Sequence, residues 1–319
     1  LLSTCWLLIR FRFRGSTASL VLAGWALGLG GANTSIFFVV VLPPAAAYLA
    51  FVLWPRPQGL CATWPQALAK ALLFGLPLAL SLAYVLGFNA FRYGSPWLNG
   101  YEGDHGYPNL TYDGSPGFSV PWWVGLHGYL FSSGKSIFIY SPPLIAALYF
   151  LRRFVARFRA EGWLVVVTAA AWLVFYSRWW AWHGDVAWGP RFTVPVTGLL
   201  LLSLAQGLAD WPRRGPVFKS VLGLLMAAGL AVQIAAVWVS FDVYFASVIK
   251  PDYSNQIILF YVPQFSPLLH QFQVAATYHP PDFFLFKTLA AEVMGGLAAL
   301  AGWLAWLSAT APEPGRQKE

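Results

Sequence analysis

The stretch from Trp182 to Phe192 holds the densest set of polar side chains in an otherwise apolar sequence. Two glycines and a proline within it permit a tight turn with an exposed backbone. Arg191 then opens the next predicted helix from its N-terminal end. A guanidinium and free backbone N–H groups at such a position suit a phosphate or pyrophosphate. The alternative is that Arg191 pairs with Asp185 and only anchors the loop.

Two further cations, Arg92 and Lys135, flank the first long loop of the chain. Together with Arg191 they could converge on one anionic headgroup and contact the phosphate of a lipid substrate. For either residue alone, the alternative is ordinary snorkelling, in which a long side chain carries its charge to the membrane surface.

Three other residues offer acid–base chemistry, namely Asp104, His183 and Asp185. A carboxylate or imidazole in these loops could act as a general base, orient an acceptor or hold a divalent cation. The alternative is that such loop residues serve solubility. Glu292 differs from them because it lies inside an apolar run, where an acid is costly and indicates a functional role. Its alternative is a hydroxyl partner on a neighbouring helix, or a shallow depth.

Long apolar runs must position these groups. A bilayer core of about 30 Å needs roughly 20 apolar residues in a helix. The chain offers a truncated first span ending near Ile9, followed by eight full ones. Four glycines between 24 and 31 would let neighbouring backbones approach closely, and Pro43-Pro44 would break the second full span. The predicted full spans are 17–32, 34–54, 66–90, 136–151, 162–181, 191–210, 217–246 and 286–308.

The cations are sorted between alternate gaps in this series. Of the 20 Lys and Arg residues, 14 fall in one set of gaps, at 10–14, 56–70, 152–159, 213–219 and 316–318. Short cytoplasmic loops are basic because Lys and Arg resist translocation. The sorting therefore predicts that these gaps and the tail 310–319 are cytoplasmic. The long loops 91–135 and 247–285 are then extracytoplasmic.

Composition agrees with a membrane location. Hydrophobic residues make up 58% and charged residues 10% of the chain, against roughly 25% charged in a soluble domain. The net charge of +8 does not indicate nucleic acid, because the basic residues are spread over several loops. The sequence therefore predicts an all-α polytopic transmembrane bundle over residues 1–309, in a bacterial inner or plasma membrane.

Several stretches resemble bacterial membrane glycosyltransferases of the C-type (GT-C) superfamily, the relatives of the dolichyl-phosphate-mannose protein mannosyltransferases. Residues 23–42 are similar to the paired short helices of that superfamily. The other similar stretches are 88–97 (FNAFRYGSPW), 130–142 (LFSSGKSIFIYSP) and 184–192 (GDVAWGPRF). The similarity runs in order over most of the chain.

The resemblance implies a sugar transferase that uses a polyprenyl-phosphate donor on the extracytoplasmic face. A carboxylate would deprotonate the acceptor hydroxyl, and basic residues would stabilise the leaving lipid phosphate. The catalytic acid of that superfamily is expected in an outer loop before Leu1. A further departure is Asn33-Thr34, where the resemblance implies an arginine.

Two rival functions follow from the same residues. The chain could be a non-catalytic transmembrane subunit that docks into a larger energy-transducing or photosynthetic complex. It could also be a lipid or solute transporter. A transporter would predict inverted repeats and several charges at the middle of the membrane, where the sequence offers Glu292.

Overall fold

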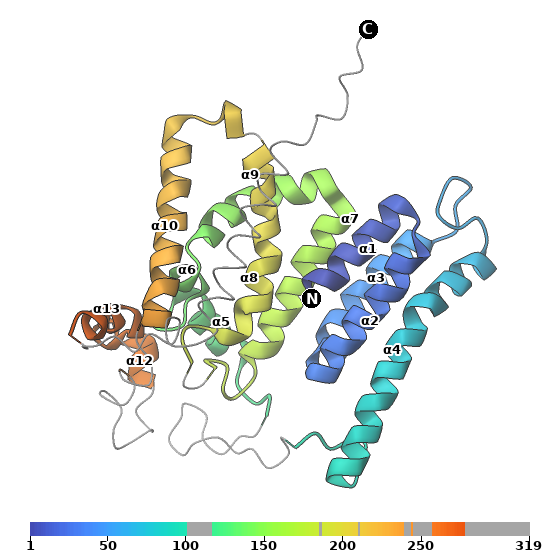
Figure 1. Ribbon diagram of the computed structural model, residues 1–319, viewed down its shortest axis with the longest axis horizontal. Coiled ribbons are helices and arrows are strands. Elements are labelled where there is room, and N and C mark those ends of the chain that lie inside the picture. Colours follow the sequence, from blue (N-terminus) through green and yellow to red (C-terminus); the bar gives the residue numbers. More distant parts are fainter. Residues whose placement is uncertain (101–116, 185–186, 210, 239–243, 245–256, 278–319) are drawn as a thin grey trace.

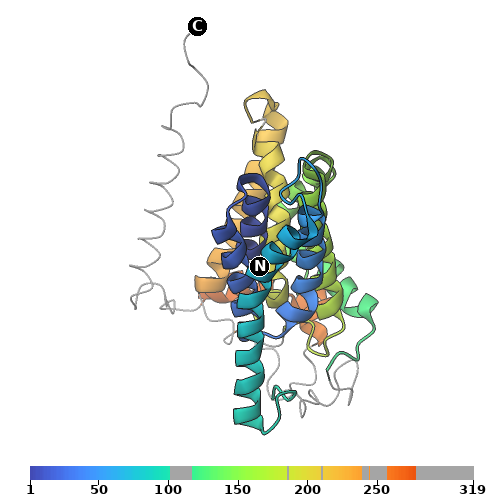
Figure 2. The ribbon, with the colours of Figure 1, turned by 90° about the vertical axis from the view of Figure 1, so that its right-hand side faces the viewer.

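The computed structural model describes residues 1–100, 117–184, 187–209, 211–238, 244 and 257–277, and these contain helices and no strand. Asp104, Asp185 and Glu292 lie outside the described residues, as does the predicted span 286–308. Figure 1 shows the helices standing side by side, and Figure 2 shows α4 reaching furthest at the lower end.

Four helical stretches are long and apolar enough to cross a membrane: Trp64–Tyr93, Pro143–Ser177, Arg191–Ala209 and Pro216–Ala236. They correspond to α4 (Trp64–Tyr93), α7 (Pro143–Ser177), the run from η2 (Arg191–Thr193) through α8 (Val194–Leu201) and η3 (Leu202–Leu204) to α9 (Ala205–Ala209), and α10 (Pro216–Trp238). The all-α class is confirmed, and these helices are compatible with an integral membrane protein. The predicted count of eight full spans stays a prediction.

The first part of the chain forms shorter helices. The predicted spans 17–32 and 34–54 become α2 (Thr17–Asn33), the π-helical turn η1 (Phe37–Val41) and α3 (Leu42–Leu53), after α1 (Leu2–Arg14). Pro43-Pro44 lies in the first turn of α3. Proline is tolerated there because the first helical N–H groups have no partner within the helix. The wide turn η1 precedes the prolines and ends where α3 begins.

Glycines bring α2 against its neighbours, as the sequence predicts. A Cβ atom on Gly24 would collide with the carbonyl oxygen of Phe74 in α4, and one on Gly28 would collide with the Ser81 side chain. Without these side chains the two helices can approach closely. This contact holds α2 against α4, and α2 ends at Asn33, which lines a pocket.

The loop predicted at 152–159 is mostly helical, and the break predicted between the two spans is a tight kink at its end. The predicted spans 136–151 and 162–181 are the two arms of α7, which meet at a kink where Phe158 and Arg159 leave helical backbone angles. Figure 1 shows α7 bending back at its upper end. A Cβ on Gly162 would meet the Cα of Val155. The kink is therefore tight, and it brings the basic residues of this stretch to one end of the bundle.

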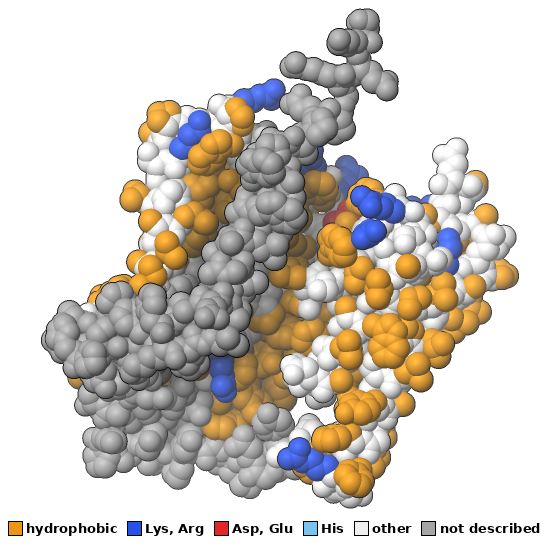
Figure 3. Space-filling model, viewed as in Figure 1, with side chains coloured by type: hydrophobic (Ala, Val, Ile, Leu, Met, Phe, Trp, Pro, Cys, Tyr) orange, Lys and Arg blue, Asp and Glu red, His pale blue; other side chains and the backbone are white. Residues whose placement is uncertain are grey.

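The two long segments that were predicted as outer loops contain helices of their own. Residues 91–135 include α5 (Trp122–Phe131), and 247–285 include α12 (Ile257–Tyr261), η6 (Pro263–Phe265) and α13 (Pro267–Thr277); the short helix α6 (Ile137–Tyr140) follows the first segment. On the face shown in Figure 3, most Lys and Arg side chains lie toward the upper end. This arrangement matches the predicted sorting of charge between two sides.

Candidate functional site

The polar stretch 182–192, of which the structure describes 182–184 and 187–192, is hydrogen-bonded to the helices at both of its ends. Gly184 and Gly189, at which the sequence predicts a tight turn, have φ angles of +79° and +61°, in the left-handed region that favours glycine. From α5, the buried Tyr129 hydroxyl donates to the carbonyl oxygen of Trp182 at 2.6 Å. From α7, the Trp172 indole N–H donates to the carbonyl oxygen of Phe192 at 2.7 Å. Both ends of the turn are thus tied to the helical scaffold.

Lys135 braces the middle of this turn. Its Nζ donates to the carbonyl oxygens of Ala187 at 2.8 Å and Gly189 at 3.1 Å, and its side chain is buried. The ammonium also lies 5.3 Å from the centre of the Phe260 ring. Desolvating a charge is costly unless several partners compensate it. In this structure Lys135 therefore supports the turn, and its predicted contact with a lipid phosphate stays a prediction.

His183 lies beside this lysine in the same buried layer. Its ring stacks on Phe260 with a centroid separation of 4.4 Å. Burial lowers the pKa of the imidazole well below its usual value, and the positive charges of Lys135 and Arg191 lower it further. A buried group with so low a pKa is neutral at physiological pH. Its predicted role in orienting an acceptor or a metal stays a prediction.

Arg191, in contrast, has an exposed side chain and lines a pocket of about 640 Å³. The guanidinium carbon lies 4.9 Å from the centre of the Phe192 ring, and that ring stacks on Tyr176 at 4.6 Å. Phe118 and Trp179, whose ring centroids are 4.9 Å apart, also line the pocket. The pocket therefore places one cation beside a broad aromatic wall.

Small polar side chains complete this pocket. Asn33, Thr34 and Ser35, which link α2 to η1, line it together with Arg191. The resemblance implies an arginine at the Asn33-Thr34 position, so this chain offers amide and hydroxyl groups there instead. Asn99 and Gly117 also line the pocket. In the sequence, Asn99 and Gly117 lie close to the two ends of the segment 101–116, which contains Asp104.

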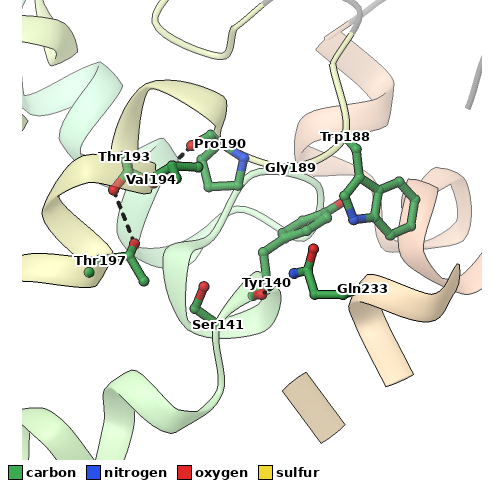
Figure 4. Close-up of a pocket in the computed structure, with 10 residues that line it drawn as sticks. Tyr140, Ser141, Trp188, Gly189, Pro190, Thr193, Val194, Thr197 and Gln233 are labelled. Atoms are coloured by element: carbon green, nitrogen blue, oxygen red, sulfur yellow. Dashed lines mark hydrogen bonds between the residues drawn. The ribbon is translucent and has the colours of Figure 1, made fainter. Parts of the chain in front are cut away.

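A second pocket lies at the neighbouring residues of the same turn. It has a volume of about 340 Å³, and Figure 4 shows Tyr140, Trp188, Pro190 and Gln233 around it. The hydroxyl of Thr193 donates to the carbonyl oxygen of Pro190 at 2.8 Å, so it is already engaged. The described residues that line this pocket carry no charge. The pocket at Arg191 is therefore the better candidate for an anion.

The structure brings only some of the predicted site residues together. Lys135, His183 and Arg191 belong to one region, because both cations act on the His183 pKa. Arg92 is exposed in the last turn of α4, where its guanidinium lies over the rings of Phe88 and Tyr93. It is not among the described residues that line the Arg191 pocket. Among the described parts of the chain, no cluster of three or more His, Cys, Asp or Glu residues could hold a metal.

Sequence reasoning missed the buried acid Glu161. This residue lies in α7 and accepts hydrogen bonds from Arg12 at 2.6 Å and from the Tyr48 hydroxyl at 2.9 Å. It is the one acidic residue within the described ranges. Its position next to an apolar run, in a chain with few acids, is the signal that could have identified it.

Comparison of the chain with protein-family models, with curated proteins and with solved structures gives no match. The resemblance to C-type glycosyltransferases is therefore carried by the residues quoted above and by no relative.

Proposed function

We propose that this chain is an integral membrane protein that binds a polyprenyl phosphate at Arg191. The observation that carries the proposal is the pocket itself, in which an exposed guanidinium stands beside aromatic rings and the polar side chains of Asn33, Thr34 and Ser35. Arginine binds phosphate oxygens through paired N–H groups. Aromatic side chains offer the apolar surface that an isoprenoid chain needs. The hydrogen bonds that hold the described part of the turn favour binding, since less order has to be created when the ligand arrives.

The reaction that we propose for this site is sugar transfer from a polyprenyl-phosphate donor. The oxygen of an acceptor hydroxyl attacks the anomeric carbon of the sugar, and the bond from that carbon to the phosphate oxygen breaks. The hydroxyl proton passes to a carboxylate; the resemblance implies an acid before Leu1 for this role, and Asp104 and Asp185 are the predicted candidates within this chain. The leaving phosphate keeps the bonding electrons. Arg191 would stabilise the charge that grows on this group, which is where preformed electrostatics contribute most to catalysis.

Binding can be tested by titrating the purified protein in detergent with undecaprenyl phosphate and measuring the bound fraction by native mass spectrometry. Arg191→Gln should weaken binding about tenfold or more, because hydrogen bonds to a charged group contribute about 1.5–3 kcal/mol. The matched control is Arg178→Gln, since Arg178 is an exposed cation near the same turn that does not line the pocket. Equal affinity in Arg191→Gln and the wild type would refute the assignment.

Transfer needs a separate measurement. With a polyprenyl-phosphate sugar as donor, release of free polyprenyl phosphate should depend on Arg191 and be lost in Asp104→Asn or Asp185→Asn. Binding that persists without any release under these conditions would support a lipid-binding subunit over an enzyme.

A further inference from the structure

A third cavity, an open groove, lies near the kink of α7. It has a volume of about 720 Å³ and is walled by Tyr48 and Phe51 of α3 and by Ala160 and Trp163 of α7. Its surface is mainly apolar. Trp163 is 58% exposed and Phe51 is 44% exposed, so the groove opens at the outer surface of the described helices. A groove of this kind between two helices suits a hydrocarbon chain.

Three guanidinium groups lie in the wall of this groove or against a residue of that wall. Arg159, at the kink, lines it directly. The guanidinium carbons of Arg12 and Arg56 lie 5.5 Å and 5.1 Å from the centre of the Phe51 ring, which is part of the wall. Glu161 pairs with Arg12 and offsets one of the three positive charges. The three arginines and Glu161 together therefore carry two net positive charges.

We propose that the groove binds one anionic phospholipid, with an acyl chain along the apolar wall and the headgroup phosphate against Arg159 and Arg56. Charge complementarity argues for this ligand. A free phosphate would leave the apolar wall unused, an acidic peptide would not match that wall, and a zwitterionic lipid would bring its own cation toward the arginines. Basic residues at a membrane surface favour anionic lipid by about 1 kcal/mol each.

This site is separate from the proposed polyprenyl-phosphate pocket. The groove contacts α7 at Trp163, whereas the Arg191 pocket contacts the same helix at Tyr176. Thirteen helical residues separate these positions, which corresponds to about 20 Å along the axis. The groove therefore lies toward the opposite end of the molecule and does not depend on the proposed function.

The test is native mass spectrometry of the full chain released from mixed micelles that contain equal amounts of phosphatidylglycerol and phosphatidylcholine. The wild type should retain one phosphatidylglycerol in clear preference to phosphatidylcholine. Arg159→Gln should reduce this preference about fivefold, as expected for the loss of one basic residue at the headgroup. Ala156→Trp places a large side chain in the groove wall, and it should reduce retention of the lipid without changing any charge.

Arg153→Gln is the matched control, because Arg153 is exposed on the first arm of α7, lies over Tyr149 and does not line the groove. This variant should keep the preference of the wild type. Three results would overturn the proposal. They are an unchanged preference in Arg159→Gln, an equal loss in Arg153→Gln, which would mean diffuse attraction, and unchanged retention in Ala156→Trp. Each variant is first compared with the wild type by gel filtration, so that misfolding is not read as lost binding.

Discussion

Replacing Arg12 by methionine removes the cation that neutralises Glu161. The Arg12 guanidinium donates to the Glu161 carboxylate at 2.6 Å, and the Tyr48 hydroxyl donates to the same oxygen at 2.9 Å. The Glu161 side chain is 6% exposed, whereas that of Arg12 is 34% exposed. Arg12→Met therefore leaves a buried carboxylate with the hydroxyl of Tyr48 as its described donor.

The size of the effect follows from this burial. Removing one partner of a fully buried ion pair costs about 3–5 kcal/mol. Because a third of Arg12 is exposed, solvent already screens part of the pair, and we expect about 2–3 kcal/mol. Glu161→Gln keeps an oxygen that can accept from Tyr48 and removes the buried charge, so it should cost less, about 1–2 kcal/mol. The double variant should fall short of the sum by about 1–2 kcal/mol, because residues in direct contact are coupled.

The free energy of unfolding is measured for the wild type, Arg12→Met, Glu161→Gln and the double variant. Each protein is held in the same mild detergent and unfolded by adding a denaturing detergent. Arg14→Met is the control, since Arg14 is an exposed arginine two residues further along the chain. If Arg12→Met destabilises the protein no more than Arg14→Met does, the buried pair contributes nothing to the fold. If the effects of the two single substitutions simply add in the double variant, Arg12 and Glu161 act independently, and the predicted coupling is refuted.

Two further predictions concern the turn and the α2–α4 contact. Because burial, Lys135 and Arg191 all lower the pKa of His183, the unfolded chain should take up a proton below about pH 6.5 that the folded chain does not. As the pH is lowered below this value, the free energy of unfolding should decrease by at most about 1.4 kcal/mol per pH unit. His183→Phe should make stability less dependent on pH. Equal pH dependence of the melting temperature for wild type and variant in detergent would contradict this prediction. Gly24→Ala should destabilise the protein by about 1–3 kcal/mol, because the added methyl group overpacks the contact with α4. At Gly75 the added methyl group would point into open space, so Gly75→Ala should be neutral or stabilising. Similar melting temperatures for the two variants would refute the close contact.

The sequence predicts those parts of the fold that depend on local chemistry. Apolar length identifies α4 and α10, and the glycines at 184 and 189 have positive φ angles within the described part of the turn. The kink of α7 is different, because neither glycine nor proline occurs between 155 and 161. Nothing in that stretch distinguishes a short loop from a helix that bends. Packing of Gly162 against Val155 decides between them, and this is a tertiary contact.

Tertiary contacts also limit what the sequence can predict about the candidate site. Arg191 can be identified from its place at the start of an apolar run, since a cation there is expected to meet an anion. Pairings such as Arg12 with Glu161 join positions 149 residues apart in the sequence. A single sequence gives no sign of such a contact. Hydropathy therefore predicts which residues lie at a helix end, but it does not predict which of them become buried.

Burial also separates the three cations that the sequence treats as equivalent. Lys135 is buried, and its ammonium group donates hydrogen bonds to backbone carbonyl groups of the turn, whereas Arg191 lines the pocket. Arg92 lies over rings of its own helix at the end of α4. Lys135 can therefore shape the turn that presents Arg191, and a ligand phosphate needs to contact only Arg191. Burial keeps His183 neutral by lowering its pKa, and the positive charges of Lys135 and Arg191 lower that pKa further, so no positive charge forms on this imidazole at physiological pH. The site thus concentrates its accessible positive charge on Arg191.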